Sequence, residues 1–131
     1  MRLLVDTHVI VRWLFDAQRL SSEQRRLLNL AVKRRDPVGI CAITLLEIAN
    51  LVSDGRLQID TRLSELFDRL EGDPIFQLLP ITYEVALESV YLGVLRDPAD
   101  RSIVATARTH GLRLLTSDQR IIASNLVSVI D

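Results

Sequence analysis

A short apolar run near the start of the chain, Leu3-Leu4-Val5, stops at the acid Asp6. A run without polar residues is typical of a strand buried on both faces, as in a parallel sheet that is covered by helices. Asp6 is then placed where this strand ends. Ligands of open parallel sheets bind beyond the carboxyl ends of the strands, so the run predicts a parallel sheet with a carboxylate at its ligand-binding edge.

Further apolar runs alternate with helical patterns along the rest of the chain. Strands are expected at residues 38–43, 76–81, 112–116 and 126–130, and helices at 9–15, 21–36, 44–54, 61–72, 82–95 and 98–110, with a short helix after residue 118. This alternation requires crossover connections and predicts an α/β fold, a three-layer α/β/α sandwich with a mainly parallel central sheet. Since no linker or repeat interrupts the pattern, residues 1–131 are expected to form a single domain.

The composition excludes several classes of protein. The formal net charge is −1, so no overall basic field points to a nucleic acid. Of the 16 basic residues only Lys33 is a lysine, and arginines suit either phosphate contacts or solvated helix faces. The single cysteine, Cys41, rules out an internal disulfide and a multi-cysteine zinc site. No apolar run is long enough for a signal peptide or a membrane span, so a cytoplasmic protein with no membrane partner is expected.

Four acids occupy positions from which they can meet at one edge of the sheet. Asp6 and Asp118 each follow a predicted strand, and Glu47 and Asp100 each lie in the first turn of a predicted helix. Like charges this close repel one another unless a cation or a proton neutralises them. Carboxylates and water form the oxygen shell that suits Mg²⁺ or Mn²⁺. The pattern therefore predicts a divalent metal site, whereas His8, which is not spaced for zinc, is expected to pack or to form hydrogen bonds.

Each of these acids also has a purely structural interpretation. Glu47 stands three residues after Thr44, which is the spacing of a helix capping box. Asp100 suits the positive end of a helix dipole, and Asp118 suits a turn or a helix cap. Asp6 is costly to bury unless it is paired, either by a metal or by a salt bridge to an arginine.

Four segments occur in an order that is typical of one family. They are Leu4–His8, Leu45–Ile48 around Glu47, Arg96–Ala107 with its Asp-Pro-Ala-Asp-Arg core, and Leu114–Asp118. In this order they resemble the PIN-domain ribonucleases that serve as toxins of VapBC-type toxin–antitoxin pairs, and the resemblance covers essentially the whole chain. One departure is Ala99, where relatives often carry a bulkier aromatic residue.

The resemblance implies a metal-dependent endoribonuclease that cuts single-stranded RNA. It assigns metal binding and catalysis to Asp6, Glu47, Asp100 and Asp118, with Mg²⁺ or Mn²⁺ as cofactor. Nearby polar side chains are expected to hold these ligands in place by hydrogen bonds; they are Thr7, Thr116, Ser117 and Asp97, the last of which also suits a helix N-cap. The implied partners are the RNA substrate, a cognate antitoxin protein and a second copy of the chain in a homodimer.

Other functions were weighed against this one. A phosphatase of the haloacid-dehalogenase type needs a second Asp at the position of His8, and a receiver domain needs a late lysine, whereas the only lysine is Lys33. A module that keeps the fold but binds RNA or protein without cleavage remains the alternative. Three apolar helix faces are either part of an antitoxin groove or part of the core; they are Val9-Ile10, Trp13-Leu14 and Ile48 with Leu51 and Val52.

Overall fold

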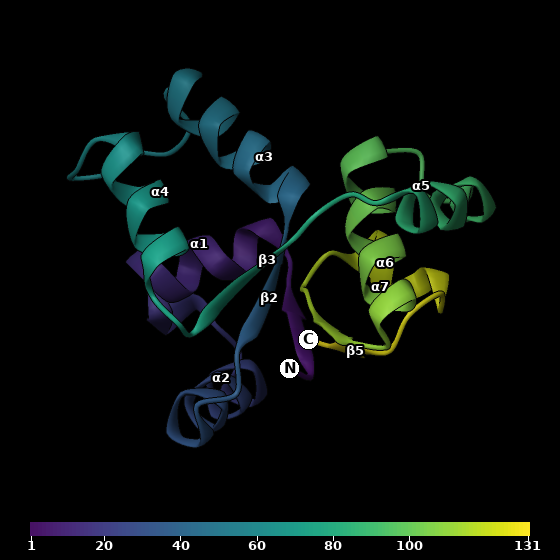
Figure 1. Cartoon of the computed structure of the whole chain (residues 1–131), viewed down its shortest axis with the longest axis horizontal. Coiled ribbons are helices and arrows are strands. Elements are labelled where there is room, and N and C mark those ends of the chain that lie inside the picture. The colour runs from purple at the N-terminus through teal and green to yellow at the C-terminus, as the bar shows by residue number, and fades with distance from the viewer.

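The central sheet of the molecule contains only parallel strands. We describe a computed structural model that covers all 131 residues. The strands are β1 (Leu3–Val5), β2 (Val38–Cys41), β3 (Phe76–Leu79), β4 (Arg113–Leu115) and β5 (Val129–Ile130), and their order in the sheet is β3-β2-β1-β4-β5. β1 lies at the centre, between β2 and β4 (Figure 1).

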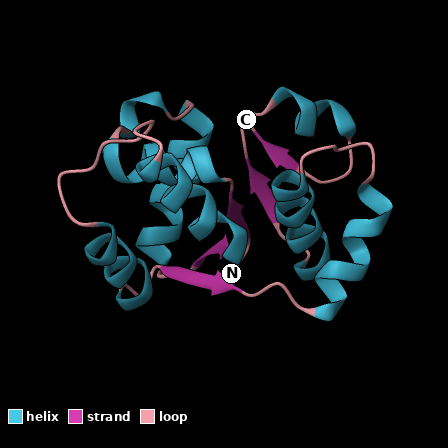
Figure 2. Ribbon diagram, turned by 90° about the horizontal axis from the view of Figure 1, so that it is seen from above, coloured by secondary structure: helices cyan, strands magenta, loops and turns pink.

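Helices cover both faces of this sheet, which confirms the three-layer α/β/α sandwich (Figure 2). One face is covered by α1 (Thr7–Phe15), α2 (Ser22–Arg34), α3 (Ala42–Ser53) and α4 (Leu63–Gly72), and the other by α5 (Tyr83–Ser89), α6 (Pro98–His110) and α7 (Gln119–Ser124). Two short 3₁₀ turns, η1 (Ala17–Arg19) and η2 (Val90–Leu92), complete the elements. None of the helices combines the length and the apolar character that a membrane crossing requires.

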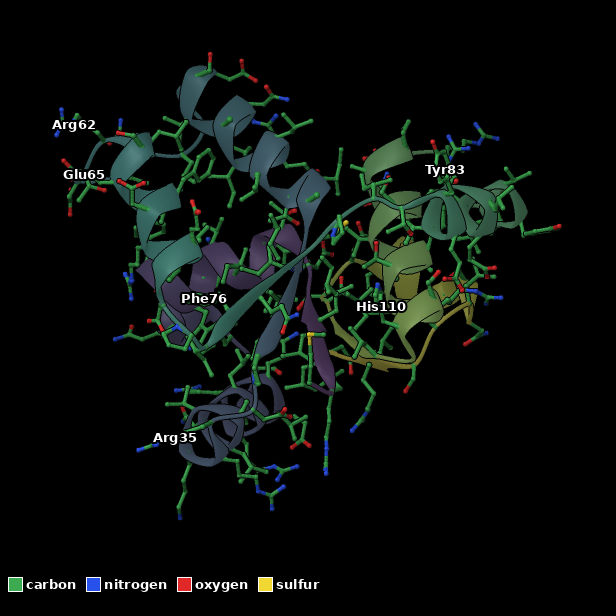
Figure 3. All side chains as sticks on the ribbon, viewed as in Figure 1. Arg35, Arg62, Glu65, Phe76, Tyr83 and His110 are labelled. Carbon is green, nitrogen blue, oxygen red and sulfur yellow. The ribbon has the colours of Figure 1, made fainter.

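Successive side chains of β1 enter two separate cores. Leu3 and Val5 belong to the cluster that packs against α1 to α4, whereas Leu4 belongs to the cluster that packs against α5 to α7. Because both faces are covered, β1 has no polar residue, as its sequence predicted. Trp13 packs edge-on against Phe76 in the first cluster, with ring centroids 5.5 Å apart; Figure 3 labels Phe76 on β3.

Several element boundaries differ from the sequence-based expectation, and those of β2, α5 and β5 are examples. The strand expected at 38–43 ends at Cys41, and α3 begins at Ala42. The helix expected at 82–95 ends at Ser89, whose hydroxyl donates to the Ala86 carbonyl and so competes with further helical hydrogen bonds. The strand expected at 126–130 contains only β5, because Asn125 ends α7 in the left-handed conformation and the next residues return the chain to the sheet.

The strand order places a topological switch point beside β1. The chain runs outward from β1 to β2 and β3 on one side, and later adds β4 and β5 on the other side. At such a point the crossovers leave in opposite directions and open a crevice at the carboxyl ends of the strands. The loops that follow β1 and β4 therefore flank this crevice.

Gln24 joins α2 to the far edge of this sheet. It is fully buried, its Nε2 donates to the Ile130 carbonyl at 3.1 Å and to Ser117 Oγ at 3.3 Å, and its Oε1 accepts from the Ser21 amide in a capping box. We expect Gln24→Ala to lower the free energy of unfolding by about 1–3 kcal/mol, because it leaves buried polar groups unpaired. Urea denaturation measures this loss, and Gln18→Ala, at an exposed position, is the control. Equal stability of the two variants would contradict the assignment.

Candidate active site

A cavity of about 400 Å³ opens at the switch point and collects all four acids singled out in the sequence. Asp6 comes from the end of β1, Glu47 from α3, Asp100 from the first turn of α6, and Asp118 from the start of α7. Asp97 also lines the cavity. The structure thus brings together side chains that are more than a hundred positions apart in the chain.

Asp6 is the most deeply held of these acids, with 5% of its surface exposed. Its Oδ1 accepts from the Thr7 amide at 2.7 Å, which caps α1, and its Oδ2 accepts from the Thr116 hydroxyl at 2.6 Å. The same Thr116 oxygen accepts from the Asp118 amide at 3.1 Å. The expected alternative, a salt bridge from an arginine to Asp6, is wrong: hydrogen-bond donors compensate this buried charge, and no arginine pairs with it.

His8 links the same two loops by a second route. Its Nε2 accepts from the Ser117 amide at 2.9 Å, and its Nδ1 lies 3.4 Å from Asp6 Oδ2. Burial lowers the pKa of His8, against the opposing charge of Asp6. An imidazole whose Nε2 accepts a hydrogen bond carries its proton on Nδ1, toward the carboxylate. The hydrogen-bonding role expected for His8 is confirmed, although its partners lie too far along the chain to be deduced from sequence.

Glu47 is not a capping residue. Because α3 begins at Ala42 with Cys41 as its N-cap, Thr44 lies inside the helix and is fully buried. The Thr7 hydroxyl donates to Glu47 Oε1 and lies 3.0 Å from the Thr44 hydroxyl. Burial raises the pKa of Glu47, and the charges of Asp6 and Asp97 add to this effect while the Thr7 hydrogen bond opposes it. Thr7 therefore holds Glu47 at the cavity, and the capping-box interpretation is wrong.

Asp97 and Asp100 present two carboxylates from the start of α6. The Asp97 side chain accepts from the Ala99 amide at 2.9 Å, with Pro98 in the first turn, so the predicted N-cap is confirmed. Asp100 points into the cavity and is 9% exposed. Burial raises the pKa of Asp100 to about 6, with further contributions from the negative charges of Asp97, Asp118 and Asp6. The shift therefore reflects burial of the carboxyl group first and the neighbouring negative charges second.

Asp118 is paired with a residue that sequence analysis missed. It caps α7 by accepting from the Arg120 amide at 2.9 Å, and its Oδ2 lies 3.3 Å from Arg120 Nη2. The same nitrogen lies 3.8 Å from Asp100 Oδ2. Although burial opposes it, the Arg120 hydrogen bonds lower the pKa of Asp118. The spacing of two residues between an acid and an arginine was visible in the sequence, but nothing there distinguished it from other surface pairs.

Comparison with known proteins identifies the family of this chain. The model of the PIN domain matches residues 3–124. Ribonuclease VapC22 of Mycobacterium tuberculosis (strain ATCC 25618 / H37Rv) is 35% identical over 123 residues, which cover 91% of this chain and 88% of that protein. The chain belongs to the PIN-domain family.

Solved structures show the same fold. FitAcB from Neisseria gonorrhoeae is 26% identical to this PIN domain with a TM-score of 0.69, and the match covers 98% of this chain and 96% of that one. VapBC2 from Rickettsia felis, bound to a DNA fragment from its promoter, matches with a TM-score of 0.74 over 99% of this chain and 98% of that one, at 14% identity.

The donors in this PIN domain fit a hard divalent cation by their chemistry. All of the acidic side chains at the cavity offer carboxylate oxygens, which Mg²⁺ and Mn²⁺ prefer. In this structure no three His, Cys, Asp or Glu side chains are gathered closely enough to enclose an ion. The positive group that stands between Asp100 and Asp118 is instead the guanidinium of Arg120.

Ionised Asp100 is expected to destabilise the metal-free protein. Its folded pKa of about 6 lies above the ordinary value of 3.8, so the stability that neutral Asp100 contributes is lost as the pH rises from about 4 through about 6. Asp100→Asn cannot ionise and should therefore be more stable than the parent at pH 7, by about 1–3 kcal/mol, with the gain disappearing below pH ~4.

Thermal unfolding in EDTA across this pH range measures the difference. Asp68→Asn, an exposed acid on α4, is the matched control and should show no such trend. Saturating Mg²⁺ should remove the advantage of Asp100→Asn. A gain that is the same at every pH would contradict the raised pKa of Asp100.

Proposed function

We propose that this PIN domain is a Mg²⁺- or Mn²⁺-dependent endoribonuclease that hydrolyses phosphodiester bonds of single-stranded RNA, and that it is the toxin of a toxin–antitoxin pair. The observation that carries the proposal is the meeting of Asp6, Glu47, Asp100 and Asp118 at one cavity of a PIN fold. The relationship to a protein named ribonuclease VapC22 supports the same activity.

The acids have distinct roles in this proposal. Asp6, fixed by two hydrogen bonds, is the central metal ligand, and Asp100 and Asp118 complete the ligand set. When bound, the divalent ion acts as a Lewis acid that activates water and offsets negative charge on the phosphate. Glu47, held by the hydroxyl of Thr7, would orient the attacking water and accept its proton.

Hydrogen bonds around the acids set their geometry. Thr116 donates to Asp6 and accepts from the Asp118 amide, so one hydroxyl fixes the distance between two ligands. Ser117 donates its amide to His8 and keeps the same loop in place. Asp97 adds negative charge beside Asp100 while it caps α6. Small displacements of metal ligands lower affinity and activity by about 10–100-fold, which is why these contacts matter.

An RNA backbone fits the rim of the cavity. Arg12, Arg19 and Arg56 line it together with the acids, and none of them is paired with an acid. Unpaired guanidinium groups suit phosphate oxygens, with which they form bidentate contacts. These arginines, the arginine track, come from α1, η1 and the loop after α3, and both α1 and α3 cover the same face of the sheet.

We propose two protein partners, an antitoxin and a second copy of the chain, and each would bind a different surface. Among the structural neighbours is a toxin–antitoxin complex from Klebsiella pneumoniae, at 21% identity with a TM-score of 0.65 over 98% of this chain and 96% of that one. An antitoxin segment would suit the open apolar cavity between α3, α4 and β3, which Leu45, Phe67 and Leu78 line. Of the other apolar faces considered from sequence, Val9, Ile10 and Ile48 are fully buried core, whereas Trp13, Leu14, Leu51 and Val52 are half-buried.

A second copy of the chain is proposed to cover an exposed apolar strip on α5 and η2. Tyr83 and Tyr91 are 94% and 78% exposed, and Leu87 and Val90 accompany them; Figure 3 shows Tyr83 on the outer side of this helix. Exposed strips of this kind mark protein interfaces.

We further propose that residues 1–131 act as one unit built on one sheet, and that the enzyme acts on RNA in the cytoplasm.

Removal of a metal ligand should abolish cleavage and leave the fold intact. We expect Asp6→Asn and Asp118→Asn each to reduce Mn²⁺-dependent cleavage of a fluorescent single-stranded RNA by about 100-fold or more, because a ligand is lost. Both variants keep the shape of the side chain, so circular dichroism should be unchanged. Asp68→Asn is the control and should cleave normally. Full activity of Asp6→Asn, or cleavage by the parent in EDTA, would refute the metal-dependent mechanism.

The arginine track should control RNA affinity through charge. We expect the combined change Arg12→Gln, Arg19→Gln and Arg56→Gln, made in the Asp6→Asn background, to weaken RNA binding and to reduce the slope of log K against log salt by about 2. Fluorescence anisotropy at several salt concentrations measures both effects. The control changes Arg25, Arg34 and Arg69 to Gln, all exposed and outside the cavity. If both triple variants have the same salt slope, the track is not the RNA-binding surface.

A further inference from the structure

Arg120 occupies the position of a cation at the acidic cavity. Its Nη2 lies 3.3 Å from Asp118 Oδ2 and 3.8 Å from Asp100 Oδ2, so one guanidinium faces carboxylates from two different helices. The other arginines of the cavity, Arg12, Arg19 and Arg56, pair with no acid. Arg120 is therefore the arginine that neutralises this part of the cavity.

The contact is held loosely. The Arg120 side chain is 74% exposed, whereas the Asp100 and Asp118 side chains are 13% and 19% exposed. Ion pairs with one exposed partner contribute little to stability, because water screens them and a long side chain loses freedom. A small, doubly charged ion with direct oxygen contacts can displace such a group.

The structure also offers a place for the displaced side chain. A second cavity of about 370 Å³ adjoins the first and shares Asp97, Asp100 and Arg120 with it. Its other side is formed by the loop between η2 and α6, which includes Arg96, and by the last turn of α7, which includes Ser124. Arg120 thus stands on the wall between two cavities and can leave one for the other without disturbing the core.

We propose that Arg120 is a built-in competitor of the divalent metal: it neutralises Asp100 and Asp118 in the metal-free protein and must move away when the metal binds. This inference rests on the proposed function, since it assumes that these acids hold the metal. Arg120 is a positioning residue and not a metal ligand. Its effect is to offset the negative charge of the empty cavity and to lower the affinity of the enzyme for its metal.

The test is calorimetric titration of the purified protein with Mn²⁺. We expect Arg120→Gln to bind Mn²⁺ about three- to tenfold more tightly than the parent, because the competitor is gone. Arg120→Lys keeps the charge without the planar fork and should fall between the two. Arg34→Gln, an exposed arginine on α2, is the control and should match the parent. The difference between parent and Arg120→Gln should shrink at high ionic strength, since screening weakens the competing ion pair.

A second readout follows the guanidinium itself. In ¹⁵N spectra of arginine side chains, the Arg120 Nε–H signal is identified by its loss in Arg120→Gln. Addition of Mg²⁺, which is diamagnetic, should shift this signal and leave that of Arg34 unchanged. A structural role alone would not produce this shift.

Two results overturn the inference, and they are distinguishable. If the parent binds Mn²⁺ and Asp118→Asn does not, yet Arg120→Gln binds no more tightly than the parent, Arg120 is not a competitor and the proposed nuclease site still stands. If neither the parent nor Arg120→Gln binds Mn²⁺, the metal site itself is wrong, and both proposals fail.

Discussion

The buried carboxylate of Asp6 is the contact on which the site depends. It ends the central strand, caps α1 through the Thr7 amide, and accepts the hydroxyl of Thr116 from the neighbouring strand end. A buried charge is tolerated only when donors compensate it, and here those donors belong to the two loops that flank the switch point. The same interactions that stabilise Asp6 therefore fix the loop that carries Asp118.

The acids around Asp6 make the empty cavity electrostatically unfavourable. The raised pKa of Asp100 and of Glu47 reflects burial first and neighbouring carboxylates second. Asp6, Asp97 and Asp118 each cap a helix, but capping does not require the further acids Glu47 and Asp100 at the same cavity. Proteins accept such local cost at functional sites, where charges are placed for a ligand and not for stability. A cation is the ligand that relieves it.

Features that depend on local sequence patterns could be predicted from the sequence, whereas contacts between residues far apart in the chain could not. The apolar run before Asp6 identified the central strand, and the Asp97-Pro98 pair identified the start of α6. Glu47 was ambiguous because Thr44 has capping-box spacing; only the position of Thr7, 37 residues away from Thr44, shows where both side chains point. Arg120 could not be singled out among many arginines, because its significance lies in its approach to Asp100, a residue on another helix.

The most deeply buried charges of this cavity are negative, whereas most of its positive charges are exposed. Asp6 and Asp100 are 5% and 9% exposed, whereas the Arg120 side chain is 74% exposed and Arg19 and Arg56 are also exposed. A polyanion that approached the acids alone would be repelled, so arginines at the rim can hold its backbone but cannot bring a phosphate to the floor. A divalent ion at the floor reverses the sign of the charge there. In the proposed mechanism, a metal ion would therefore bind before a phosphate could make productive contact with Asp6, Asp100 and Asp118.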